Sequence, residues 1–252
     1  MKNKILMILV VTMLGMPAVA SAELIQFGTG NILTFRQCTS GETTCDSFGP
    51  MLFSTWGGIP GELLSEVSQA DVAYGEAYGS AVLTEEPGAA ELKVITVSLP
   101  ATRNGSTSVI LQRYTNAGES TEKLTFEAEL TYTQTVPAEN AGFPDDAGMG
   151  SGASAEIVIF TMDVDAIETG ATAEEVYGAL SFEQEPAGLK DLDAARAAPS
   201  SDETGEGTST LSATTIIEPG DSVWLWAILQ GIVVNGATVN ASLETTLDRS
   251  AD

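Results

Sequence analysis

Carboxylates are the ionisable side chains that this 252-residue chain holds in greatest number. It has 35 Asp and Glu residues against 10 Lys and Arg residues, and it has no His. The lack of His excludes Ser-His-Asp and Cys-His nucleophiles, as well as zinc, copper and haem sites that need an imidazole ligand. The formal net charge of −25 repels a phosphate backbone, so we expect no nucleic-acid partner. Catalysis, if there were any, would depend on paired carboxylates.

Glu127 and Glu129 show how such a pair would have to work. A glycosidase holds two carboxyl groups roughly 5–10 Å apart, facing one another across a cleft. These two residues lie two apart in a predicted strand, so their side chains point side by side to one face. We interpret that face as solvated, and we expect the chain not to be an enzyme. A carboxylate-only glycoside hydrolase is the third hypothesis, after a structural protein and a binding module.

Two aromatic groups are the candidates for a ligand platform. Tyr74, Glu76 and Tyr78 alternate along a predicted strand, which would place all three on one face, as in a sugar-stacking site. An ordinary exposed sheet face explains the same pattern. Trp224 and Trp226 also share one face of a strand. The opposite face of that strand is equally apolar, which favours packing inside the protein over a ligand platform.

Calcium is the metal that we consider, because an exported acidic chain would meet it outside the cell. Asp163, Asp165 and Glu168 offer hard oxygen ligands, but their spacing lacks the third donor and the glycine of an EF-hand loop. Surface solvation explains these residues without an ion. Apart from this calcium hypothesis, we expect no cofactor.

Residues 1–22 have the three parts of a secretory signal peptide. Lys2 and Lys4 precede an apolar run over residues 5–14, and small residues at 18–22 place the predicted cleavage site before Glu23. The longest later apolar segment, residues 223–234, is too short for a transmembrane helix. We therefore expect an exported protein, periplasmic or extracellular, with no integral membrane segment after cleavage.

The predicted oxidising compartment determines how the two cysteines are interpreted. Cys38 and Cys45 enclose six small or polar residues, which is typical of a disulfide that closes a surface loop. A redox-active pair would have the shorter C-x-x-C spacing.

Alternation of apolar and polar residues dominates the mature chain, residues 23–252. About ten strands are predicted, bounded by Gly, Asn, Pro and Ser clusters: residues 31–37, 51–56, 72–83, 91–99, 108–114, 124–135, 154–162, 209–217, 222–234 and 237–247. This pattern predicts an all-β, two-sheet antiparallel sandwich in a single domain. Asn235-Gly236 is the strongest signal for a hairpin with a type I′ turn.

Helices and long loops are predicted to be minor features of this domain. Residues 60–68, 172–180 and 186–198 are candidates for short helices. Acidic loop excursions are expected at about residues 139–152 and 187–208, both within the one domain.

Three segments carry a resemblance to a known group of proteins. Residues 70–81 are ADVAYGEAYGSA, residues 219–226 are PGDSVWLW, and residues 235–247 are NGATVNASLETTL. They resemble strands of exported bacterial proteins of the PEP-CTERM-associated type, although the C-terminal sorting tail of that group does not appear before Asp252. The resemblance implies a jelly-roll-like sandwich in the cell envelope or extracellular matrix of a Gram-negative bacterium, and it assigns no catalytic residue.

These observations favour an exported structural or adhesive protein without catalytic activity. The alternative is a carbohydrate-binding module, calcium-dependent if the acidic residues bind an ion. The expected partner is a glycan or another component of the envelope or matrix.

Overall fold

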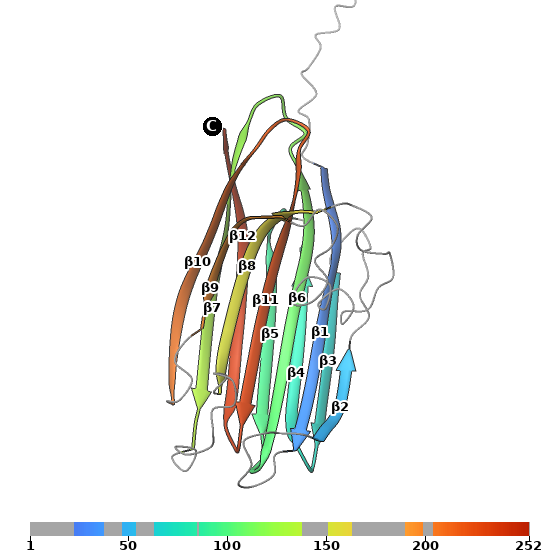
Figure 1. Cartoon of the computed structure of the whole chain (residues 1–252), viewed down its shortest axis with the longest axis vertical. Helices are drawn as coiled ribbons and strands as arrows, with labels where there is room; N and C mark the ends of the chain where they lie inside the picture. The colour runs from blue at the N-terminus through green and yellow to red at the C-terminus, as the bar shows by residue number, and fades with distance from the viewer. Residues whose placement is uncertain are drawn as a thin grey trace, which may run out of the picture.

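The computed structural model describes residues 23–37, 47–53, 63–84, 86–137, 151–162, 190–198 and 204–251. Within these ranges the chain forms strands and no helix, and the strands build two antiparallel six-stranded sheets (Figure 1). The prediction of an all-β two-sheet sandwich is confirmed. The strands are β1 (Glu23–Gln37), β2 (Ser47–Phe53), β3 (Leu63–Asp71), β4 (Gly75–Leu83), β5 (Ala90–Ser98), β6 (Thr102–Thr115), β7 (Glu122–Thr135), β8 (Gly152–Thr161), β9 (Lys190–Ala197), β10 (Gly205–Ile217), β11 (Ser222–Val234) and β12 (Thr238–Ala251).

The strand order is that of a jelly roll extended on one side. The first sheet has the order β2-β1-β6-β11-β8-β9, and the second has the order β10-β7-β12-β5-β4-β3. From β5 onward the pairs are nested along the sequence, β5 with β12, β6 with β11, β7 with β10 and β8 with β9, and they alternate between the sheets. This nested pairing defines the jelly roll. The antiparallel pairs β1–β2 and β3–β4 widen one sheet each.

The prediction of a hairpin at Asn235-Gly236 is wrong, although the tight turn itself is present. Both residues have positive φ, 50° and 85°, and the Ala237 amide donates to the Val234 carbonyl at 3.1 Å, as a tight turn requires. The flanking strands do not pair with one another, because β11 belongs to the first sheet and β12 to the second. The turn therefore forms an arch that carries the chain from one sheet to the other.

This arch is joined to a second one at the same end of the sandwich. The β5–β6 connection also crosses between the sheets, and the Asn235 amide donates to the Thr102 carbonyl at 2.9 Å. Asn235 Oδ1 accepts a hydrogen bond from the Ala101 amide at 3.0 Å, and the Ser98 amide donates to the Ala237 carbonyl at 3.0 Å. The two arches thus satisfy one another's backbone groups at the place where both strand ladders end.

A second pair of crossing connections closes the other end. Asn116, on the β6–β7 connection, is fully buried and donates from Nδ2 to the carbonyls of Ser120 and Ile217, at 2.9 and 3.3 Å. Its own carbonyl accepts from Gly220 at 2.7 Å, which ties it to the β10–β11 connection. One amide side chain therefore fixes two loops that are about a hundred residues apart in sequence.

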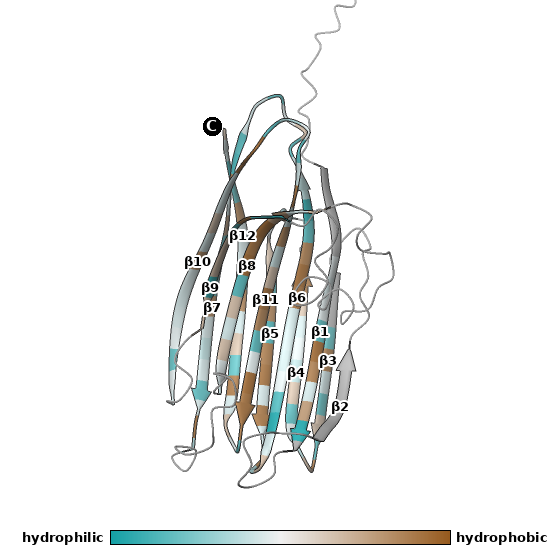
Figure 2. Cartoon of the chain, viewed as in Figure 1, coloured by the Kyte–Doolittle hydropathy of each residue, from teal (hydrophilic) through white to brown (hydrophobic). Residues whose placement is uncertain are grey.

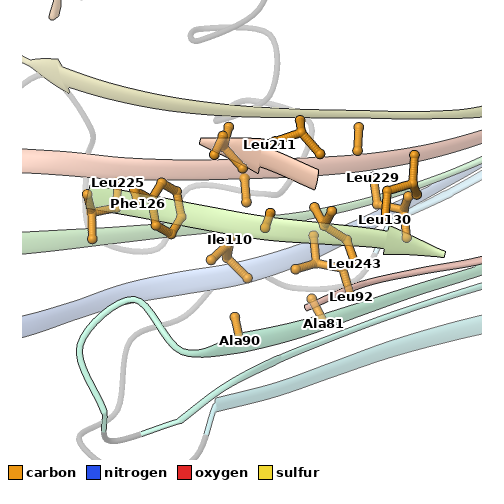
Figure 3. Close-up of a cluster of buried hydrophobic side chains, with 14 of the residues drawn as sticks. Ala81, Ala90, Leu92, Ile110, Phe126, Leu130, Leu211, Leu225, Leu229 and Leu243 are labelled. Carbon is orange, nitrogen blue, oxygen red and sulfur yellow. The ribbon is translucent and has the colours of Figure 1, made fainter. Parts of the chain in front are cut away.

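Alternation of side chains along the strands fills the space between the sheets with apolar groups. Figure 2 shows β11 largely in hydrophobic colour, and Figure 3 shows leucine, isoleucine and phenylalanine side chains meeting in the interior. Removal of these side chains from water is the main stabilising contribution, at roughly 25 cal/mol per Å² of apolar surface. The fully buried members include Leu92, Ile110, Phe126, Leu130, Ile157, Leu225, Leu229 and Leu243.

Between β6 and β5 the interior is polar, and we call the buried residues Thr96, Asn104, Ser106 and Ser108 the polar seam. Ser106 Oγ donates to the Ile95 carbonyl at 3.2 Å, and Ser108 Oγ donates to the Lys93 carbonyl at 2.9 Å, so hydroxyls of the first sheet reach the backbone of the second. The sheets are close together here because the facing residues are small. A Cβ on Gly79 of β4 would lie 3.2 Å from Ser108 Oγ.

Two of the three helix predictions are wrong. Residues 63–71, predicted in part as a helix over 60–68, form β3, and residues 190–197, predicted as a helix within 186–198, form β9. Each is an edge strand that pairs with one neighbour, and this tertiary pairing outweighs a weak local helix preference. β9 also lies inside the loop excursion expected at 187–208. The helix predicted at 172–180 lies outside the described residues.

Candidate functional site

The outward-facing side of the second sheet carries the exposed side chains of Glu76, Glu129 and Glu244, and we call it the acidic face. Glu127 and Glu129 both belong to it, side by side on β7 as predicted. Glu129 lies directly opposite Glu244 on β12, and Glu244 lies directly opposite Glu91 on β5. Adjacent strands in a sheet are about 5 Å apart, so these three carboxylates form a row of like charges.

Lys93 is the cation that balances one end of this row. Its Nζ lies 2.6 Å from Glu91 Oε1, an ion pair in which both side chains are about half exposed. The hydrogen bond that Lys93 donates to Glu91, followed by the charge of that carboxylate, raises the pKa of Lys93 above its ordinary value of 10.5. Burial lowers the same pKa by a smaller amount, and Tyr78 and Glu244 raise it by still smaller ones.

Tyr78 and Ile95 form an apolar patch on the acidic face. They are directly opposite one another on β4 and β5, and Ile95 is 41% exposed. Glu76 lies on the same face, two residues before Tyr78 and opposite Val97. The patch therefore presents a phenol ring and an aliphatic side chain, with a carboxylate and an ammonium group beside them.

Tyr74 does not join this patch, contrary to the prediction that it shares a face with Glu76 and Tyr78. It lies in the turn before β4, and its ring packs edge-on against Phe35 with centroids 6.1 Å apart and planes at 62°. Gly75 follows with a φ of 116°, a value outside the range of an ordinary strand residue, and this interrupts the alternation of side chains. Tyr74 therefore packs with the small cluster of Leu33, Phe35 and Ala77.

Trp224 and Trp226 are buried, with exposed fractions of 2% and 6%. They lie on the side of β11 that faces away from the space between the sheets, opposite Phe160 and Val158 of β8. The side chains on the other face of β11 belong to the main core. Both faces of this strand are thus removed from water over residues 223–229, and the two indoles offer no open platform to a ligand.

Several predicted site residues cannot be placed. Cys38, Cys45, Asp163, Asp165 and Glu168 all lie outside the described residues, so the disulfide and the calcium site stay predictions. Within the described ranges, no three acidic or cysteine side chains are grouped as a metal site would require. The same ranges contain no helix of the length and hydrophobicity needed to cross a membrane.

Four residues of this site were not identified from the sequence: Glu91, Lys93, Ile95 and Glu244. Alternation in residues 91–99 does place Lys93 and Ile95 on one face of a strand. What alternation cannot supply is the register between strands, which brings Tyr78 opposite Ile95 and Glu244 opposite Glu91.

Comparisons with known proteins add little to this geometry. No protein-family model matches the chain, and no curated protein matches it. One solved structure that it resembles is described as "Structural basis for the promiscuous specificity of the carbohydrate-binding modules from the beta-sandwich super family", with 9% identity, a TM-score of 0.25, and coverage of 87% of this chain and 94% of that one. Another is described as "Structure of infectious bursal disease virus Gx strain", with 11% identity, a TM-score of 0.20, and coverage of 88% and 54%. Neither likeness is close enough to bear on function.

Proposed function

We propose that this chain is an exported, non-catalytic adhesive protein of a bacterial envelope or extracellular matrix, and that the acidic face is its binding surface. The observation that carries the proposal is the Tyr78–Ile95 pair on the neighbouring strands β4 and β5 of a polar sheet face, where Ile95 is 41% exposed and Tyr78 is partly exposed. Exposed apolar groups rimmed by polar ones are typical of binding sites. The signal peptide predicted at residues 1–22 supports a location outside the cytoplasm.

The arrangement of carboxylates supports binding rather than hydrolysis. Glu127 and Glu129 project in parallel from one strand, and Glu91, Glu244 and Glu129 follow one another across three strands of the same face. A glycosidase needs two carboxyl groups that approach a bond from opposite sides. Side chains that project in parallel from one strand point alongside one another rather than toward a bond between them.

A glycan is the second, more specific candidate for the partner, and the patch itself favours it. The face of a phenol ring stacks on the apolar face of a sugar, while Glu76 and Lys93 can accept and donate hydrogen bonds to its hydroxyls. The row of three glutamates gives this face a negative potential. An uncharged polysaccharide therefore fits better than an acidic one.

The test is retention of the purified chain, residues 23–252, on envelope fractions, on extracted matrix and on insoluble neutral and acidic polysaccharides. We expect retention that falls at least tenfold in the double variant Tyr78→Ala, Ile95→Thr. Thr133→Ala is the matched control, because Thr133 lies on the same face in β7 and in the same row as Ile95. Melting curves confirm that each variant is folded.

Each outcome bears on a different part of the proposal. Retention by none of the materials would refute adhesion. Retention that the double variant leaves unchanged would refute the choice of surface. Release of reducing sugar ends from any polysaccharide would show that the chain is a hydrolase, contrary to the proposal.

A further inference from the structure

Among the described strands, the edge strand β10 has a long row of backbone groups that no neighbouring strand pairs with. Within the part of the chain that the structure describes, it is the last strand of the second sheet and pairs with β7 alone, in an unbroken register from Gly205 to Ile217 (Figure 1). Most of the residues from Gly205 to Ser212 are exposed. An edge of this kind is a template for pairing with another strand.

The direction of the free groups follows from one hydrogen bond. The Thr214 amide donates to Asp193 Oδ2 of β9 at 2.7 Å, so this amide points away from β7. Because backbone groups alternate in direction along a regular antiparallel strand, the amides and carbonyls of Thr208, Thr210 and Ser212 also point away from β7. Asp193 covers the end of the row, and no other described side chain bonds to the outward groups of these three residues.

The other edges of the sandwich carry features that discourage pairing. β9 has four charged residues among its eight, β3 carries Glu66 and Asp71, and β2 contains Pro50, which has no amide hydrogen to donate. β10 has no proline, and Glu206 is its single charged residue. In a chain with a net charge of −25, such a nearly neutral edge is the exception.

We propose that β10 pairs with β10 of a second copy of the chain and forms a symmetric dimer with a continuous twelve-stranded sheet. An antiparallel register centred on Thr210 places Thr210 opposite itself and Thr208 opposite Ser212. Three residue pairs then exchange two backbone hydrogen bonds each. Glu206 falls opposite Thr214, so no two charged residues of the two β10 strands lie opposite one another; because the Thr214 amide is bound by Asp193, the backbone pairing extends only over residues 208–212.

A second copy of β10 fits this edge better than the strands of the chain that carry more charge. A strand with several carboxylates, paired at this edge, would be repelled by the glutamates of the acidic face. β10 of a second copy instead places Thr and Ser hydroxyls next to Thr and Ser hydroxyls. Repulsion between the rest of the two acidic chains is long-range, and salt shortens its range to about 8 Å at physiological ionic strength. Dimer formation should therefore increase with salt.

This inference does not rest on the proposed function, although the two are compatible. The two-fold axis of such a pair runs perpendicular to the sheet, so both acidic faces stay on the same side of the dimer. Two binding patches on one side would raise the apparent affinity for a polymer through multivalency.

The decisive experiment measures mass by sedimentation equilibrium on the chain covering residues 23–252. We expect a mass twice that of the monomer, with a dimer fraction that rises with salt. Thr210→Pro removes only an outward amide and should restore the monomer mass. Ser68→Lys on the β3 edge is the matched control and should stay dimeric.

A charge-swap pair keeps the inference testable if the proline variant does not fold. Thr208→Lys, Ser212→Lys places lysine opposite lysine in the proposed register, and Thr208→Glu, Ser212→Glu places glutamate opposite glutamate. Each variant should be monomeric alone, and an equal mixture should dimerise. A wild-type chain that stays monomeric at every concentration and salt level would overturn the inference, as would a dimer that both charge variants retain.

Discussion

Asn104 gives the most direct test of the packing that positions the acidic face. Its side chain is buried on β6, and Nδ2 donates to the carbonyls of Tyr74 and Val97, at 2.8 and 2.6 Å. These two bonds join the first sheet to the turn before β4 and to β5, the strands that carry Tyr78 and Ile95. Asn104→Asp keeps the shape of the side chain and removes both donors.

The expected cost has two parts. At a pH low enough to protonate the new carboxyl, it can still donate one of the two bonds, so about 1–2 kcal/mol is lost. At neutral pH a buried carboxylate would face two carbonyl oxygens, which raises its pKa in the folded state above its unfolded value of about 3.9. A rise of about two units adds roughly 2.7 kcal/mol, for a total near 4 kcal/mol at pH 7.

The sign of the pH dependence follows from linkage. Because the folded-state pKa at position 104 is the higher one, the variant is relatively most stable below pH 4. It should lose about 1.4 kcal/mol per pH unit from there until the folded-state pKa is passed, and then show no further change. Urea unfolding followed by tryptophan fluorescence from pH 4 to 8, with the wild-type chain at each pH, measures this difference.

Asn240→Asp is the matched control, because Asn240 is exposed on the outward side of β12. It should change the free energy of unfolding by no more than about 0.5 kcal/mol. If Asn104→Asp is as mild as this control at every pH, Asn104 does not hold the two sheets together. A large but pH-independent loss would mean that the new carboxyl is not buried against carbonyl groups.

Three further predictions concern other residues. Tyr114 donates its hydroxyl proton to Glu122 at 2.6 Å, and burial raises the pKa of its phenol above 10.0, so Tyr114→Phe should cost about 1.5–3 kcal/mol at pH 7. This advantage of the wild type should decline as the pH rises from about 10 through the higher folded-state pKa, in unfolding measured from pH 8 to 11; a constant difference would contradict it. Trp224→Ala should cost about 3–5 kcal/mol in urea unfolding and leave polysaccharide retention per folded molecule unchanged, whereas an open indole platform would give the reverse. Expression with the complete leader in a Gram-negative host should yield an exported chain that begins at Glu23 by N-terminal sequencing, and a retained leader would refute the signal-peptide assignment.

Much of the fold could be predicted because alternation and turn chemistry are local properties. The pattern in residues 124–135 predicts the strand β7, and β7 places Leu124, Phe126 and Leu130 in the core as alternation requires. For the site, the same pattern places Glu127 and Glu129 on an outer face. It also predicts that Glu76 and Tyr78 share a face, which the structure confirms.

Prediction failed where one residue or one distant partner changed the outcome. Gly75, with its positive φ, separates Tyr74 from the strand that alternation predicted for it. The helix predictions at residues 60–68 and 186–198 failed because β3 and β9 each complete a sheet edge. The local sequence of a segment does not show that it can pair with the edge of a sheet formed by distant residues.

The sequence alone determined the period-two strands and the left-handed backbone at Asn235 and Gly236. These follow from the chemistry of neighbouring residues, since φ above zero needs residue types that tolerate it. Only the tertiary structure decided that this turn is an arch between sheets, because β11 and β12 each find both of their neighbours elsewhere in the jelly roll. The same competition for strand partners sets the register that brings Tyr78 to Ile95, and pairing over such distances depends on the whole chain.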